Sequence, residues 1–307
     1  MSGPDIGASV RQRLLNRSRA ENRPFQELLQ YFAMERFLYR LSKSAFAERF
    51  ILKGALLLTA WRAPLTRPTM DIDLAGQTSN ELDHIKAAVR TVCEIDVAPD
   101  GIEFSHAAIE VSRIKEAAGY EGVRVQFRAT LARARVPIQL DIGFGDVITP
   151  GPTEIEYPTL LDFPAPVLRV YPRETVVAEK LEALTALGLL NSRMKDFYDL
   201  ALLSRMYAFE GKALSKAVSA TFRYRGTAIE AEPIGLTNSY SDDSARAVQW
   251  RAFMRRSRFE TTDHDLRRLV DEIRRCALPV LSMLVKEKPF NAHWKPGGPW
   301  DEPPAGP

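Results

Sequence analysis

Two aspartates, Asp71 and Asp73, lie one residue apart in the segment 70–75, whose alternating pattern predicts a β-strand. Side chains of a strand alternate between its faces, so both carboxylates share one face about 7 Å apart, while Ile72 and Leu74 point to the core. Two such carboxylates resist joint ionisation unless a cation lies between them. Mg²⁺, or else Mn²⁺, is the natural candidate, because such ions bind carboxylates together with phosphate oxygens of a substrate. The alternative is a pair of solvated acids on an amphipathic strand.

A third carboxylate, Asp141, belongs to a strongly apolar segment, 136–142. The apolar residues of this segment alternate onto one face of a predicted strand, which places Gln139 and Asp141 on the opposite face. The strand ends at a bend, 143–145, and sites of α/β proteins are common where strands end. Asp141 could therefore complete a cation site, the alternative again being a solvated strand face.

Lys53 and Gly54 occupy a predicted strand-to-helix turn. A glycine allows the backbone to approach a phosphate closely, and a helix N-terminus offers unpaired N–H groups. An ordinary turn glycine is an equally good interpretation of this pair.

Lys180 lies on the wrong side of the predicted helix 173–188 for a solvated lysine. At about 100° per residue it falls inside the apolar stripe, together with Arg173, whereas Glu179 and Glu182 fall on the opposite side. The stripe itself consists of Val176, Val177, Leu181, Leu184 and Leu187. Two inward cations indicate an anionic ligand or an internal carboxylate. The alternative is a lysine whose stem covers the edge of the core.

Asp196 and Asp199 are i, i+3 neighbours in the predicted helix 194–207, on a face that apolar residues share. Acids in a first helical turn also complement the helix dipole, which is the simpler explanation. Pairing of either acid with Lys180 or Arg173 would account for both sets of inward charges.

In this order along the chain, four segments resemble motifs of the AbiEii-type nucleotidyltransferase toxins of bacterial type IV toxin–antitoxin systems, including the mycobacterial MenT group. Residues 50–55 are similar to the opening Lys-Gly-Gly motif of the family, and residues 67–74 to its metal-binding segment. Residues 177–183 resemble its lysine motif, and residues 193–200 its closing acidic motif. Each motif is short, but four in this order are jointly specific.

The resemblance implies an α/β (α+β) N-terminal domain of the polymerase-β nucleotidyltransferase type, followed by an all-helical C-terminal domain. It implies that Asp71 and Asp73 hold Mg²⁺ against the triphosphate of an NTP, with Asp141 added from strand geometry. Lys180 would neutralise charge on the phosphates, and Asp196 would act as a base or as the group that orients Lys180. The expected phosphate-binding set is Lys53, Gly54, Ala55, Arg67, Thr69, Arg173 and Asp199. Ala55 departs from the family, which usually has a second glycine there.

The reaction implied by the resemblance is transfer of a nucleotide from an NTP to an acceptor, with tRNA 3′ ends as the target in some members. The expected partners are therefore an NTP, an RNA acceptor and an antitoxin encoded nearby. Two alternatives remain open at this point: a nucleotidyltransferase that modifies a protein or a small molecule, and a non-catalytic nucleotide-binding subunit.

The composition agrees with a folded chain that has a divided charge. The 307 residues contain 42 Lys and Arg against 39 Asp and Glu, and 45% are hydrophobic, which excludes a mostly disordered chain. Residues 1–50 and 246–275 each carry nine basic and five acidic side chains, whereas residues 51–245 carry 21 basic and 26 acidic ones. Basic ends could contact RNA phosphates, although solvated helix faces give the same pattern.

Turn-forming residues divide the chain into an α/β part, 1–150, with an N-terminal helical arm, a helical part, 151–287, and a tail, 288–307. The tail has six prolines, and we expect it to be flexible. Strands are expected at 50–52, 70–75, 102–114, 122–131, 135–144 and 167–171, and helices at 24–42, 79–93, 173–188, 194–207, 212–222, 242–257 and 262–286. Two cysteines cannot build a four-ligand zinc site, and no apolar run approaches the roughly 20 residues of a membrane span. We expect a cytoplasmic protein without a membrane contact.

Overall fold

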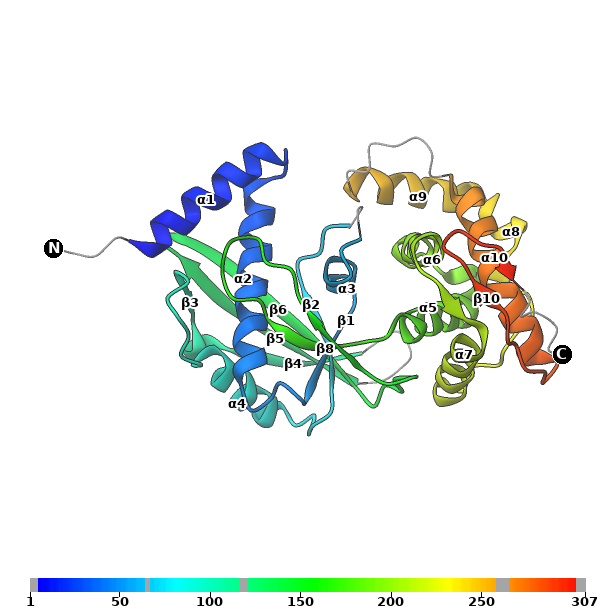
Figure 1. The fold of residues 1–307 in the computed structure, drawn as a ribbon, viewed down its shortest axis with the longest axis horizontal. Coiled ribbons are helices and arrows are strands. Elements are labelled where there is room, and N and C mark those ends of the chain that lie inside the picture. Colours follow the sequence, from blue (N-terminus) through cyan, green and yellow to red (C-terminus); the bar gives the residue numbers. More distant parts are fainter. Residues whose placement is uncertain (1–4, 64–66, 116–120, 258–264, 302–307) are drawn as a thin grey trace. The chain divides into compact units, whose positions relative to one another are not determined.

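The computed structural model describes residues 5–63, 67–115, 121–257 and 265–301. The chain divides into two compact units (Figure 1). Unit 1 consists of Met1–Asp146 and Pro152–Tyr171, and unit 2 of Val147–Gly151 and Pro172–Pro307. The predicted fold class, a mixed α/β part followed by a helical part, is confirmed.

A mixed sheet forms the body of unit 1, with the strand order β3-β5-β6-β2-β1-β8-β7 and with β4 also paired to β5. The strands are β1 (Phe50–Lys53), β2 (Ile72–Gly76), β3 (Ile102–Phe104), β4 (Glu110–Lys115), β5 (Glu121–Leu131), β6 (Ala134–Phe144), β7 (Thr153–Glu156) and β8 (Val167–Val170). The pairs β2–β6 and β1–β8 are parallel, and the others are antiparallel. In β6 the apolar residues are buried and alternate with more exposed polar ones, as the sequence pattern predicts.

The predicted strand 102–114 is interrupted, which is a correction. Phe104 is the register partner of Ala129, and Glu110 that of Gln126, so residues 105–109 face only residues 127 and 128 of β5. The surplus residues cannot pair in a continuous ladder, and they form a short 3-10 turn, His106–Ala108, between β3 and β4.

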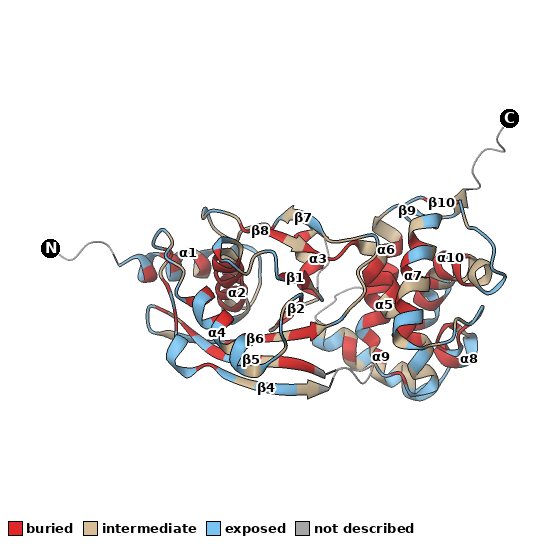
Figure 2. Ribbon diagram, turned by 90° about the horizontal axis from the view of Figure 1, so that it is seen from below, coloured by how far each residue is buried: buried red, intermediate tan, exposed pale blue. Residues whose placement is uncertain are grey.

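Helix α2 (Phe25–Lys43) crosses the sheet and is buried along most of its length (Figures 1 and 2). Phe37 of this helix contacts Phe104 and Phe127 of the sheet, with ring centroids 5.9 and 5.4 Å apart. Unit 1 is completed by α1 (Ile6–Ala20), α3 (Leu56–Ala60) and α4 (Leu82–Cys93). This aromatic packing fixes the sheet that carries the candidate site.

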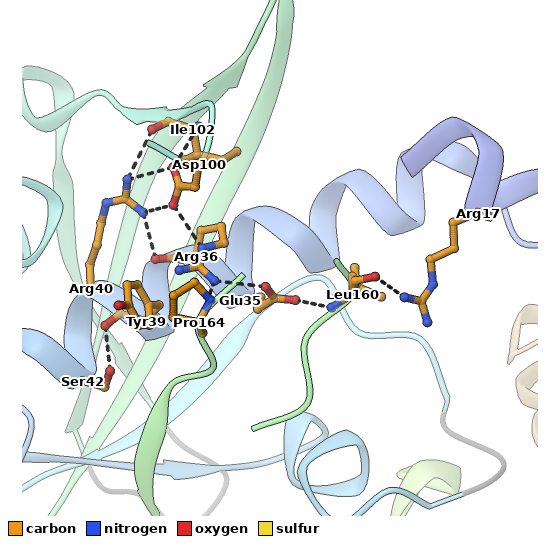
Figure 3. A network of polar contacts seen from close by, with 10 residues as sticks. All are labelled: Arg17, Glu35, Arg36, Tyr39, Arg40, Ser42, Asp100, Ile102, Leu160 and Pro164. Carbon is orange, nitrogen blue, oxygen red and sulfur yellow. Dashed lines mark hydrogen bonds and ion pairs between the residues drawn. The ribbon is translucent and has the colours of Figure 1, made fainter. Parts of the chain in front are cut away.

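A buried polar network ties α2 to two loops (Figure 3). Arg36 and Arg40 both bind Asp100, with N–O distances of 3.0 and 2.7 Å. The carboxylate of Glu35 accepts the N–H of Leu160 at 2.7 Å, and Arg36 donates to the carbonyl of Pro164 at 3.0 Å. Residues 160–164 are therefore fixed to unit 1.

Unit 2 is built from α5 (Arg173–Leu187), α6 (Met194–Met206), α7 (Gly211–Arg225), α8 (Asn238–Ser241), α9 (Ser244–Ser257) and α10 (Leu266–Val285). Helix α5 is covered on both sides. Glu182, which the helical pattern assigns to the side away from the core, is only 2% exposed. It pairs with Arg225 of α7 at 2.7 Å and accepts the hydroxyl of Thr227 at 2.6 Å.

The prediction that the tail is flexible is wrong for residues 293–301. These residues include β10 (His293–Trp294) and β11 (Trp300–Asp301), which form a small sheet with β9 (Phe209–Glu210). The indole of Trp294 is 2% exposed and donates to the carbonyl of Ser204 at 2.7 Å. Trp300 donates to the carbonyl of Cys276 at 2.9 Å. The buried Trp294 and the half-buried Trp300 anchor this segment in spite of its prolines, whereas residues 302–307 lie outside the described residues.

Across the described residues, no helix combines the length and the apolar character that a bilayer-spanning segment requires.

The buried carboxyl of Glu35 gives unit 1 a distinct pH dependence. Burial raises its pKa to about 7, against the lowering effect of Arg36 and of the Leu160 N–H group. A carboxyl whose folded pKa is raised stabilises the fold fully below its unfolded pKa, and this contribution is lost as the pH rises through 7. We predict that the wild type loses about 2–3 kcal/mol of unfolding free energy between pH 5 and 8 relative to Glu35→Gln. Urea unfolding across this range measures the difference, and parallel profiles would contradict it.

Candidate active site

Three carboxylates gather on one face of the sheet in unit 1. Parallel pairing of β2 with β6 sets Asp73 opposite Asp141, and Asp71 directly precedes β2. One oxygen of each side chain lies within 4.8 Å of the other two, and all three residues are half-buried. Hard oxygen donors converging in this way form a suitable site for a divalent cation. The structure thus brings together the three aspartates that the sequence predicts as metal ligands.

Arg124 of β5 is the register partner of Asp141 and binds it through two hydrogen bonds of 2.8 Å. This contact, aided by the charges of Asp71 and Asp73, raises the pKa of the Arg124 guanidinium. With the three carboxylates ionised, these four side chains carry two negative charges, which one divalent cation would balance. The sequence analysis missed Arg124, although the alternation of the strand at 122–131 places it on the polar face.

Thr69 fixes the position of Asp71. Its hydroxyl donates to the carboxylate of Asp71, and its backbone N–H donates to the hydroxyl of Tyr31 at 3.1 Å. Thr69 is 7% exposed, and burial raises the pKa of the Tyr31 phenol. The charge of Arg67 acts on the same phenol in the opposite direction. Thr69 therefore contacts a predicted metal ligand directly, through a side chain that is itself buried.

Gly54 lies against Asp73, because Lys53 and Asp73 are register partners in the antiparallel pair β1–β2. Its φ is +73°, and a Cβ at this position would lie 1.9 Å from a carboxylate oxygen of Asp73. Only glycine satisfies both the conformation and the close approach. Ala55 has an ordinary helical conformation with φ −68°, so the residue at which this chain departs from the family motif needs no glycine.

The ammonium group of Lys53 lies 2.7 Å from the carboxylate of Asp146. The same carboxylate oxygen accepts the hydroxyl of Tyr171 at 2.8 Å. Lys53 and Asp146 are both largely buried, so the lysine is held in a defined place beside the turn. The sequence analysis gave no role to Asp146, because only the folded chain brings the bend after β6 next to β1.

A second charged cluster lies within unit 2. The ammonium group of Lys180 is 2.7 Å from Asp196 and 2.9 Å from Asp199. The other oxygen of Asp196 lies 2.8 Å from Nε of Arg193. The two aspartates are 1% and 3% exposed at their side chains, and Lys180 is 16% exposed. The predicted pairing of Lys180 with these acids is confirmed.

Local packing explains how helix α6 presents its acids. The side chain of Asn191, which is fully buried, accepts the N–H of Arg193 at 2.8 Å just before the helix begins. The hydroxyl of Tyr240 donates to the carbonyl of Asn191 at 2.7 Å, and its ring stacks on Phe197. The remaining cation that the sequence predicts to face inward, Arg173, lies with its guanidinium 3.9 Å from the ring centroid of Tyr207.

The mixed sheet with an acidic cluster, followed by a helical unit, is the arrangement of a nucleotidyltransferase, and comparison with known families identifies which one. The family described as "Nucleotidyl transferase AbiEii toxin, Type IV TA system" matches residues 36–272. The chain therefore belongs to the AbiEii family of nucleotidyltransferase toxins of type IV toxin–antitoxin systems.

Two solved structures from Helicobacter pylori are similar to this chain. JHP933 is 16% identical, with a TM-score of 0.50 over 85% of this chain and 94% of that one. A proposed nucleotidyltransferase is also 16% identical, with a TM-score of 0.47 over 86% of this chain and 99% of that one. At this identity the likeness to JHP933 concerns the fold. No curated protein matches the chain at a significant level.

Gly54→Ala tests the close approach at the turn. The added methyl group must displace Asp73, so we expect weaker divalent-cation binding and a loss of about 2–3 kcal/mol of unfolding free energy. Gly226→Ala is the matched control, because Gly226 also has a positive φ, +68°, but a Cβ there meets nothing within 4 Å. Calorimetric titration with Mn²⁺ and urea unfolding measure the two effects. Equal behaviour of the two variants would contradict the assignment.

Lys180→Met tests the buried cluster of unit 2. Removing the ammonium group leaves Asp199 without this counter-charge and Asp196 with only Arg193, which we expect to cost about 3 kcal/mol of unfolding free energy. Lys216→Met, at an exposed lysine of α7, should change the stability by less than about 0.5 kcal/mol. Adding Asp199→Asn to Lys180→Met should recover part of the loss. Urea unfolding of the four proteins provides the comparison, and an unaltered Lys180→Met would refute a structural ion pair.

Proposed function

We propose that this chain is a metal-dependent toxin that transfers a nucleotide from an NTP to the 3′ end of an RNA, with tRNA as the acceptor. The observation that carries the proposal is the carboxylate cluster of Asp71, Asp73 and Asp141, which lies beside the glycine turn of β1. Membership of the AbiEii family supplies the reaction class. It also implies an antitoxin as partner, and we place the activity in the cytoplasm, where NTPs and tRNA are found.

In the proposed reaction an acceptor hydroxyl oxygen bonds to the α-phosphorus of the NTP, and the bond from that phosphorus to the bridging oxygen breaks. Pyrophosphate leaves with the electron pair of the broken bond, and the hydroxyl loses its proton. A divalent cation, Mg²⁺ or Mn²⁺, would supply charge neutralisation at the phosphates and a more acidic hydroxyl. Asp71, Asp73 and Asp141 would hold this cation, with Thr69 fixing Asp71 through its hydroxyl.

The turn after β1 is the proposed phosphate side of the site. Gly54 admits the close approach of the backbone, and the N–H groups that follow at Ala55 would face phosphate oxygens. Lys53 would add a cation that Asp146 holds in place. Arg67 would contribute further positive charge. Such a set stabilises charge by position, which is the main requirement of phosphoryl and nucleotidyl transfer.

We propose that Lys180 and Asp196 are also essential for transfer, with Lys180 neutralising phosphate charge. The contacts of Asp196 favour an orienting role over that of a general base. Its two oxygens lie against Lys180 and Arg193, and its side chain is 1% exposed. Both oxygens are thus already engaged by cations of the protein. Asp199 would hold Lys180 in the same way, and Arg173 would supply additional charge for the phosphates.

Helix α9 is the proposed contact for RNA phosphates. Arg251, Arg255 and Arg256 are exposed along it. By contrast, Arg13 and Arg17 of the equally basic helix α1 bind Asp162 and Glu21 within unit 1. The basic C-terminal segment therefore retains more cations for a polyanion than the N-terminal one.

Labelled transfer tests the proposal. Purified protein is offered each of the four α-labelled NTPs with total RNA and Mg²⁺, and we expect label in the tRNA fraction. Asp71→Asn should reduce transfer at least about 1,000-fold, because it removes a cation ligand. Asp162→Asn, at a fully exposed aspartate of unit 1, should leave transfer unchanged. Chelation of the metal should abolish transfer, and Mn²⁺ should restore it.

The same experiment separates the alternatives. If label appears in the protein or small-molecule fraction and is lost in Asp71→Asn, the acceptor is a protein or a small molecule and not RNA. Nucleotide binding without transfer to any fraction would favour a non-catalytic subunit. Equal labelling by the wild type and Asp71→Asn would refute the proposed site.

A further inference from the structure

A cavity of about 520 Å³ opens beside Asp71, within unit 1. Ser105 and Ala108, from the segment between β3 and β4, form part of its wall. From β5 and β6 the lining includes Gln126, Arg128, Pro137 and Gln139, on the face that carries Asp141, and also Phe127 and Ile138 of the buried face. The volume falls in the range of sites for small molecules and nucleotides, about 300–1,000 Å³.

The most buried residue of the cavity lining is Gln30 of α2, which is 0% exposed. Its amide nitrogen donates to the carbonyl of Met70 at 3.2 Å and to that of Pro137 at 2.8 Å. Two carbonyl acceptors fix the orientation of the amide, since only its NH₂ group can donate to them. Its oxygen has no hydrogen-bond partner among the described residues. A buried acceptor without a partner is unfavourable, and a donor supplied by a bound ligand would satisfy this oxygen.

Further amides connect the cavity to the carboxylate cluster. The NH₂ group of Gln126 donates to the oxygen of Gln139 at 3.1 Å, and the NH₂ group of Gln139 lies 3.3 Å from the carboxylate of Asp141. Because the carboxylate accepts, the direction of this chain is fixed, and the oxygen of Gln126 is directed to a donor outside the chain of amides. The cavity thus offers hydrogen-bond acceptors at Gln30 and Gln126, and one exposed cation, Arg128.

Apolar surface accompanies these acceptors. Met70, 53% exposed, and Pro137, also exposed, line the cavity, and they are the two residues whose carbonyls bind Gln30. Flat apolar surfaces beside a directed acceptor suit a planar heterocycle that carries an N–H donor. Adenine, cytosine and guanine carry an exocyclic amine of this kind, and a neighbouring phosphate would suit Arg128.

We propose that this cavity binds the terminal base of the acceptor RNA and reads its exocyclic amine through the side-chain oxygen of Gln30. The inference rests on the proposed function. The order β6-β2-β1 places the aspartates of β2 between the cavity on one side and the Gly54 turn on the other. In-line displacement puts the attacking and leaving oxygens on opposite sides of the phosphorus. With pyrophosphate leaving toward the Gly54 turn, the acceptor approaches from the cavity.

The test removes one chemical group, the exocyclic amine, from the acceptor RNA and, in a parallel experiment, from the NTP. An RNA acceptor ending in 3′-adenosine is compared with the same RNA ending in purine riboside, which lacks only the amine. We expect the wild type to prefer adenosine about tenfold in kcat/KM, the effect of one hydrogen bond to a buried acceptor. In Gln30→Met the preference should fall to about one. The preference is a ratio of two kcat/KM values measured on the same protein. A smaller folded fraction of Gln30→Met lowers both values equally and does not change the ratio.

A second variant and a second reactant complete the design. Gln126→Leu, at an exposed position, should reduce the preference without disturbing α2, and it replaces Gln30→Met if that variant does not fold. ATP is compared with purine riboside triphosphate in parallel, and this ratio should be the same in all three proteins.

Three outcomes would overturn the inference alone: a wild-type ratio of one, a ratio that both variants retain, or a Gln30-dependent preference on the NTP. Absence of transfer in the wild type would overturn the proposed function and the inference with it.

Discussion

Like charges held close together are the constraint on which unit 1 depends. Three carboxylate oxygens within 4.8 Å of one another repel, and nearby positive charge or hydrogen-bond donors lower the cost of holding them together. Arg124 provides one positive charge directly, and the hydroxyl of Thr69 donates a hydrogen bond to Asp71. The three carboxylate oxygens together form a suitable site for a divalent cation. Gly54 is needed for the same cluster, because Asp73 occupies the space that a side chain at position 54 would fill.

Unit 2 also holds acidic side chains close together, but there the neighbouring cations of the protein neutralise them. Its cluster has two cations, Lys180 and Arg193, against two buried acids, so its charges balance within the protein. A balanced cluster holds its lysine at one place, whereas a cluster with net charge is suited to a ligand of opposite charge. Of these two clusters of described residues, the one in unit 1 carries a net negative charge and the one in unit 2 does not.

Periodicity was sufficient to predict most elements and the side of the strand on which Asp71, Asp73 and Asp141 lie. It could not predict that β2 pairs with β6, because more than fifty residues separate these strands and no local signal encodes the pairing. The sequence pattern does not identify Arg124 and Gln30 as residues of the site, because the residues that they contact are brought to them only by the tertiary structure. The tail was misjudged because proline content was given more weight than Trp294 and Trp300. The proposed roles of the site residues and the division at residue 150 remain predictions.

The surplus residues between β3 and β4 have a consequence for how such a protein can diversify. Residues 105–109 have no register partners in β5, although the backbone N–H of Ser105 donates to the carbonyl of Arg128 in that strand. A change in the length of this segment therefore leaves the register that aligns Arg124 with Asp141 unshifted. The wall of the cavity is therefore free to vary while the carboxylate cluster stays fixed. If the cavity binds the acceptor as proposed, insertions at this one point would change which acceptor fits and leave the residues of the reaction unchanged.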